Sequence, residues 1–64
     1  MQQHLTEREK ELMKFLVTGM TNTQLAKEMI ISVHTIKSML ENLFRKFNVH
    51  SRLELVVSYL KKDD

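Results

Sequence analysis

One segment of the sequence, residues 31 to 47, combines an apolar stripe and a polar stripe at the spacing of a helix. At about 100° per residue, its apolar side chains fall on one face and its hydrogen-bonding side chains fall on the other. The apolar stripe contains Val33, Ile36, Leu40, Leu43 and Phe47, with Met39 and Phe44 at its edges. The opposite face contains His34, Ser38, Glu41 and Arg45, flanked by Thr35, Lys37, Asn42 and Lys46. A purely structural helix also has a polar back, so the pattern predicts a helix held by a core and leaves its outer partner open.

Capping boxes predict where three other helices begin. In a capping box, a Ser or Thr hydroxyl and a Glu or Gln side chain three residues later satisfy each other's backbone N–H groups. The matching segments are residues 6 to 9, 21 to 24 and 51 to 54. Before the two-faced segment, Ser32 is a suitable cap, but Thr35 stands three residues later and leaves the box incomplete. Either the free amides and the Thr35 hydroxyl bind a phosphate, or Ser32 caps the helix adequately alone.

These signals predict four helices and their ends. The first runs from about Glu7 to Thr18 and stops at Gly19, which adopts positive φ without cost. The second runs from about Asn22 to Met29, the third from Ser32 to Phe47 with Asn48 in the left-handed conformation, and the fourth from about Arg52 to Leu60. In the first two helices we expect these side chains to be buried: Leu12, Met13, Phe15, Leu16, Leu25, Ala26 and Met29.

The fourth predicted helix carries more apolar residues than one face can hold. We expect Leu53, Val56, Val57 and Leu60 to point inward, which places Leu55 and Tyr59 on the outer side. In so small a domain, Leu and Tyr on one outer ridge suggest a subunit contact, although single exposed apolar residues are normal.

The composition favours one small all-α domain, a four-helix bundle-like fold. The chain has 64 residues, one glycine, no proline and no cysteine, which excludes disulfides and thiolate metal sites. Ile30, Ile31 and Ser32 form a connection too short for an antiparallel return, so the second and third helices must cross steeply, as in a helix-turn-helix. No apolar run approaches the roughly 20 residues of a membrane span, so we expect a cytoplasmic protein.

The positive charges are concentrated around the two-faced helix. The formal net charge is only +2. Residues 27 to 52 nevertheless carry an excess of three positive charges, from Lys27, Lys37, Arg45, Lys46 and Arg52 against Glu28 and Glu41. A basic surface beside a solvent-facing helix suits the neutralisation of phosphates, although three charges alone are weak support.

Four segments in order make the chain resemble the LuxR/FixJ/GerE-type helix-turn-helix domain of bacterial transcription regulators. They are Leu-Thr-x-Arg-Glu at 5 to 9, Thr-Asn-x-x-Leu-Ala at 21 to 26, Ile-Ser-x-x-Thr-Ile-Lys at 31 to 37 and Arg-Lys-Phe-x-Val-x-Ser-Arg at 45 to 52. The resemblance implies that residues 1 to 64 form one such domain, whose central part spans about residues 5 to 60. The promoter-recognition domain of sigma factors has a similar start and turn, but the connection into an apolar fourth helix argues against it.

The resemblance implies a third helix in the DNA major groove, a second helix across the backbone and a fourth helix for dimer formation. The family's base-reading positions match Lys37, Ser38 and Glu41. The phosphate contacts map to Thr23, Thr35, Lys46 and Arg52. The polar face of the two-faced helix adds His34, Asn42 and Arg45 as further DNA-facing candidates. The dimer contact is expected on the fourth predicted helix, at Leu55, Val56 and Tyr59.

Glu41 is a departure from the family, which often has a neutral or basic group there; Asn48 for glycine and Met39 for histidine are two others. The Glu41 carboxylate could accept from cytosine N4, or it could pair with Arg45 one turn later.

The expected partner is double-stranded DNA with a near-palindromic operator, bound by a homodimer in the nucleoid. RNA polymerase or an upstream receiver or ligand-binding domain are further possible partners. The sequence leaves open whether the domain stands alone or belongs to a larger protein. It also leaves open whether the regulator activates or represses its genes.

An enzyme is the poorest alternative. His4, His34 and His50 fall on separate predicted elements without metal-ligand spacing, and no glycine-rich phosphate loop is present. We therefore expect no catalysis, metal or cofactor. A protein-interaction or dimerisation module with only weak DNA binding is a better rival, because the apolar fourth helix could contact another protein.

Overall fold

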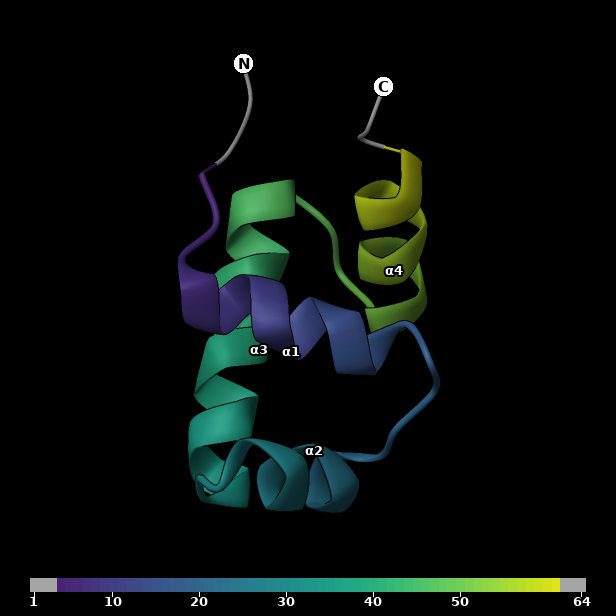
Figure 1. The fold of residues 1–64 in the computed structure, drawn as a ribbon. Helices are drawn as coiled ribbons and strands as arrows, with labels where there is room; N and C mark the ends of the chain where they lie inside the picture. The colour runs from purple at the N-terminus through teal and green to yellow at the C-terminus, as the bar shows by residue number, and fades with distance from the viewer. Residues whose placement is uncertain (1–3, 62–64) are drawn as a thin grey trace.

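The computed structural model describes residues 4–61 as four α-helices joined by short loops (Figure 1). They are α1 (Glu7–Leu16), α2 (Asn22–Met29), α3 (Val33–Phe47) and α4 (Arg52–Lys61). These residues contain no strand, which confirms the predicted all-α fold. The ends of the predicted domain, residues 1–3 and 62–64, lie outside the described part of the chain.

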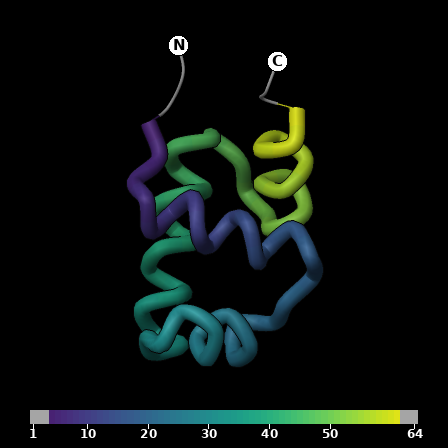
Figure 2. Tube along the Cα trace, viewed as in Figure 1, coloured from purple at the N-terminus to yellow at the C-terminus, as the bar shows by residue number. Residues whose placement is uncertain are grey.

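The longest helix, α3, packs against two of the other helices. It contacts α2 and α4, and α1 contacts the same two helices. Figure 2 traces α2 across the N-terminal end of α3, while α4 lies beside the opposite end. The steep crossing predicted from the short connection is therefore present, and α2 and α3 form a helix-turn-helix. None of the described helices is long and apolar enough to cross a membrane.

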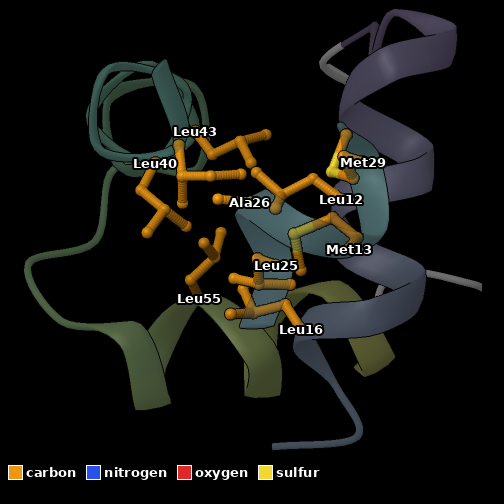
Figure 3. Close-up of a cluster of buried hydrophobic side chains, with 10 residues drawn as sticks. Leu12, Met13, Leu16, Leu25, Ala26, Met29, Leu40, Leu43 and Leu55 are labelled. Carbon is orange, nitrogen blue, oxygen red and sulfur yellow. The ribbon is translucent and has the colours of Figure 1, made fainter. Parts of the chain in front are cut away.

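All four helices contribute to a single core. Figure 3 shows its aliphatic and methionine side chains converging between the helices. Its members are Leu12, Met13 and Leu16 of α1, Leu25, Ala26 and Met29 of α2, Ile36, Leu40 and Leu43 of α3, and Leu55 of α4. Every predicted core residue of α1 and α2 is buried except Phe15, which is partly buried against this cluster. The predicted apolar stripe of α3 is confirmed, since its remaining members also pack there.

The helix starts follow the predicted caps, with one change. Thr6 with Glu9 and Thr21 with Gln24 form complete capping boxes. At α4 the Glu54 amide donates to Ser51 Oγ at 3.1 Å, as expected. The Glu54 carboxylate, however, accepts from the His50 amide at 2.8 Å, one residue before the expected donor. The predicted start of α4 at Arg52 is nevertheless correct, because the Ser51 hydroxyl caps the helix as expected.

The helix ends contain one feature that the sequence did not predict. Helix α1 ends at Leu16, two residues before the expected Thr18, and the turn closes at Gly19 with φ 94°. Asn48 has φ 56°, as predicted, but Ile30 also has φ 57°. Both follow one pattern, in which the next amide donates to a carbonyl five residues back.

Three of the four α4 side chains predicted to point inward are exposed, and Leu55, predicted to point outward, is buried. Leu55 is fully buried, whereas Leu53, Leu60 and Val57 are 73%, 62% and 44% exposed. Val56 and Tyr59 are partly buried against the core. The expectation of an outward Leu55 is therefore wrong. Apolar residues occupy both sides of α4, so periodicity alone could not decide which side the core would cover.

Candidate nucleic-acid interface

The predicted base-reading residues share the outer face of α3. Lys37, Ser38 and Glu41 are all exposed. They lie opposite the buried Ile36, Leu40 and Leu43, which hold α3 in place from the other side. The further DNA-facing candidates, His34, Asn42 and Arg45, are exposed as well and extend this polar surface along the helix.

The structure bears on the open question about Glu41. The Arg45 guanidinium donates from Nη2 to Asn42 Oδ1 at 2.9 Å. Within residues 4–61, the ion pairs join Arg8 to Glu11, Lys10 to Glu7 and Lys46 to Glu9. Glu41 therefore has no ion pair in the described part of the chain, and Arg45 is held by the neighbouring amide instead.

The N-terminus of α3 is capped by Ser32 alone. Ser32 Oγ accepts from the Thr35 amide at 3.0 Å, and it lies 3.0 Å from Thr35 Oγ1. Both residues are exposed. Thr23, another phosphate candidate, is exposed in the first turn of α2. The two threonine candidates thus lie in the first turns of α2 and α3, where the unpaired amides of a helix favour anions.

Lys46, predicted to contact phosphate, forms an internal ion pair. Its Nζ donates to Glu9 Oε1 at 2.6 Å and to the His4 carbonyl at 3.1 Å. Glu9 is only 7% exposed and also accepts from the Thr6 amide. Burial raises the pKa of Glu9, but the bonds from Lys46 and Thr6 lower this pKa by more, to below its ordinary value of 4.5. A phosphate contact by Lys46 would have to compete with this pair.

Arg52, the other basic phosphate candidate, is likewise engaged within the domain. Its Nη1 donates to the Met20 carbonyl at 3.3 Å, and its Nη2 donates to Asn22 Oδ1. The side chain is partly buried and joins the α1–α2 connection to the start of α4. The base-reading candidates are thus gathered on one face, whereas Lys46 and Arg52 hold elements together.

Comparison with known families decides the class of this fold. Residues 3–59 match the family model described as bacterial regulatory proteins, luxR family. The chain belongs to the luxR family. As a helix-turn-helix domain of this family, it is a DNA-binding domain of the kind used in transcription regulation.

Curated relatives of this luxR-family domain are bacterial regulators. The chain is 39% identical over 59 residues to a nitrate/nitrite response regulator protein homolog of Haemophilus influenzae, covering 92% of the chain and 28% of that relative. It is 40% identical over 58 residues to the nitrate/nitrite response regulator protein NarP of Escherichia coli, covering 91% and 27%. It is 42% identical over 52 residues to the CsgBAC operon transcriptional regulatory protein of Escherichia coli, and this match covers 81% of the chain and 24% of that relative. The chain thus spans about a quarter of these relatives.

Besides the internal contacts of Arg52, sequence reasoning missed two contacts that stabilise this luxR-family domain. Glu9 was predicted in a capping box, but its burial against Lys46 joins residues 37 positions apart. Arg8 donates to the Met29 carbonyl at 3.3 Å and so caps the end of α2. No local pattern signals either contact, because both depend on how the helices pack. Within residues 4–61, no group of three His, Asp or Glu side chains is arranged to hold a metal ion.

Proposed function

We propose that this domain binds double-stranded DNA sequence-specifically, with α3 in the major groove, as the DNA-contacting part of a transcription regulator. The observation that carries the proposal is the outer face of α3, where Lys37, Ser38 and Glu41 are exposed together above a buried apolar stripe. The major groove, about 12 Å wide, admits an α-helix. Lys37 can donate to guanine or to phosphate, and Ser38 can donate or accept.

Phosphate contacts would come mainly from the starts of α2 and α3. Thr23 and Thr35 present hydroxyls beside helix N-termini on these two helices. We propose that α2 lies across the DNA backbone while α3 enters the groove. Lys46 and Arg52 would contribute by fixing the helices, and they would reach phosphates only where DNA displaces their internal partners.

We further propose a homodimer through α4, which would bind a near-palindromic operator. The expected contact residues Leu55, Val56 and Tyr59 are buried or partly buried against the core. The proposed contact is therefore formed by the exposed Leu53, Val57 and Leu60. Leu53 and Val57 also line a surface hollow beside the α3–α4 connection, together with Asn48, Val49, His50, Glu54 and Ser58. Three exposed aliphatic side chains on one side of a short helix favour burial against a second copy.

The relatives support a larger regulator. Because the chain spans about a quarter of them, and two are named response regulators, we propose that a signal-receiving domain accompanies this domain in the whole protein. RNA polymerase is a further proposed partner of such a regulator. A DNA-bound regulator would be found with the nucleoid in the cytoplasm.

The exposed face of α4 also supports a second candidate function, a protein-interaction module with only weak DNA binding. The two functions differ in how they respond to salt. A helix in the groove releases counterions from phosphates, so its affinity for DNA falls steeply as salt rises. A protein-only module shows no such dependence.

The substitution Lys37→Ala tests the DNA-binding function. We expect it to weaken binding to a selected duplex by about 1–3 kcal/mol if Lys37 reads a base, and to lower the salt slope by roughly one if it contacts a phosphate. Fluorescence anisotropy at several salt concentrations measures both. Lys10→Ala on α1, which removes an exposed lysine outside the proposed interface, is the matched control. If Lys37→Ala behaves as Lys10→Ala does, Lys37 is not in the interface.

A further inference from the structure

We infer that Glu41 is a specificity-determining residue that selects a cytosine in each operator half-site. The inference rests on the proposed function, because it requires α3 to lie in the major groove. Glu41 lies one helical turn after Lys37 on the exposed face of α3. The phosphates of DNA repel a carboxylate. A carboxylate on the face that enters the groove would therefore need a hydrogen-bond donor on a base edge as its partner.

The Glu41 carboxylate is available for such a donor. Arg45, the basic residue one turn later, donates to Asn42 instead. The other basic neighbour is Lys37, four residues earlier, and no ion pair joins it to Glu41 in residues 4–61. A lysine placed before a glutamate at this spacing is the weaker orientation of a helical ion pair. Glu41 therefore has no ion-pair partner within residues 4–61, and its hydrated carboxylate lies on the surface that would meet DNA.

The edges of the bases in the major groove make cytosine the best match. An ionised carboxylate only accepts hydrogen bonds. Guanine presents two acceptors, O6 and N7, and thymine presents the O4 acceptor and a methyl group, so both repel it or leave it unpaired. Adenine offers N6–H but places the N7 acceptor beside it. Cytosine offers its N4 amino donor without an adjacent acceptor on the same base.

The same carboxylate would also discriminate against wrong sites. Where no cytosine amino group is present, Glu41 faces base acceptors and phosphates with its charge desolvated, which weakens non-specific binding. Lys37 and Glu41 are separated by about 6 Å along the helix axis. At about 3.4 Å per base pair, the selected cytosine should lie within about two base pairs of the base that Lys37 contacts.

Selection of bound sites from random duplexes at low salt tests this assignment, using the 64-residue chain and three variants. The wild type should select a cytosine at one position in each half-site. Glu41→Gln should change that position to adenine, because glutamine pairs with adenine N6 and N7, and Glu41→Lys should change it to guanine. Glu7→Gln, which removes an α1 carboxylate whose side chain is 93% exposed, should select the wild-type sequence.

Affinity measurements on the selected duplexes complete the test. Replacing the cytosine should weaken wild-type binding roughly tenfold. The same replacement should not weaken binding by Glu41→Gln, because this variant has no preference for cytosine. The affinity of Glu41→Gln for random duplex should be higher than that of the wild type. If the wild type selects a defined site and both Glu41 variants select the same site, Glu41 does not read a base and the DNA-binding function stands. If the wild type shows no salt-sensitive DNA binding, the proposed function fails, and the inference fails with it.

Discussion

Ile30 occupies a backbone conformation that β-branched residues avoid. It ends α2 with φ 57° and ψ 49°, and its side chain is 88% exposed. The left-handed conformation costs an ordinary residue about 1–2 kcal/mol. No burial of its own side chain offsets that cost, and the turn that it forms leads directly into the cap of α3. The connection between the two helices of the helix-turn-helix is therefore strained at one residue.

Replacing Ile30 with asparagine should stabilise the domain. Asparagine tolerates positive φ, as Asn48 does at the end of α3. We expect a gain of about 1 kcal/mol, which corresponds to a rise of about 4–8 °C in Tm for a domain of this size. Thermal unfolding followed by circular dichroism measures it. The neighbouring Ile31→Asn is the control and should lower Tm, because Ile31 packs against the core. An unchanged or lower Tm for Ile30→Asn would show that Ile30 is not strained.

The same pair of residues shows what local sequence can and cannot indicate. Asn48 was predicted in the left-handed conformation because its residue type favours it, and the structure confirms this. Ile30 was not predicted, because its residue type opposes the conformation that the packing of α2 on α3 imposes. The conformational preference of the residue type thus identified Asn48, where it agrees with the backbone. It failed at Ile30, where tertiary packing overrides it.

At the scale of elements, the Glu9–Lys46 ion pair joins the start of α1 to the end of α3. Glu9 belongs to the α1 cap through Thr6, so one carboxylate serves both a capping box and a contact between helices. Removing Lys46 would leave a nearly buried carboxylate without its charged partner. Such a group costs about 1–3 kcal/mol or more, which is a large part of the stability of a small domain.

This pair predicts a pH dependence of stability. The pKa of Glu9 in the folded protein lies below 4.5, so the unfolded chain binds the proton more readily. Glu9 therefore stabilises the fold above pH 4.5, and this contribution is lost as the pH falls through the lowered pKa.

Urea unfolding between about pH 6 and pH 2 measures the effect. The free energy of unfolding should fall more steeply with acid in the wild type than in Glu9→Gln. The control Glu7→Gln removes an exposed carboxylate of the same helix. Its free energy of unfolding should fall with acid as steeply as that of the wild type. Equal slopes for the wild type and Glu9→Gln would contradict the role given to the ion pair.

The elements also differ in how far the sequence specifies them. The start of each helix and the buried stripe of α3 could be predicted, because caps and a strongly two-faced pattern are local signals. The orientation of α4 could not, since this helix has apolar residues on both sides and the core covers the one containing Leu55. Lys46 and Arg52 were expected at phosphates on the strength of a resemblance, whereas their internal partners depend on packing.

At the scale of the whole molecule, the exposed face of α4 suggests assembly. One copy would offer few phosphate contacts, because Lys46 and Arg52 have internal partners. Two copies on one operator would raise the effective concentration of the second α3 near its half-site, and so raise affinity without new contacts.

The substitution Val57→Asp tests this assembly. It places a charge among Leu53, Leu60 and the hollow beside them, so a dimer through α4 should dissociate. Sedimentation should then report the monomer mass, while circular dichroism shows the helix content retained. Ile30→Asp introduces the same charge at an exposed aliphatic residue distant from α4 and should leave the dimer intact. A wild type that is monomeric at every concentration, or a Val57→Asp dimer, would contradict assembly through this face.

The most direct test of the central claim is to map amide chemical shifts by NMR while the domain is titrated with its selected duplex. If α3 lies in the major groove, the largest changes should fall on the α3 amides of Lys37, Ser38 and Glu41 and on the first turns of α2 and α3. The amides of α1 should change little. Changes confined to α4, or no change at low salt, would contradict the claim that this domain reads DNA with the outer face of α3.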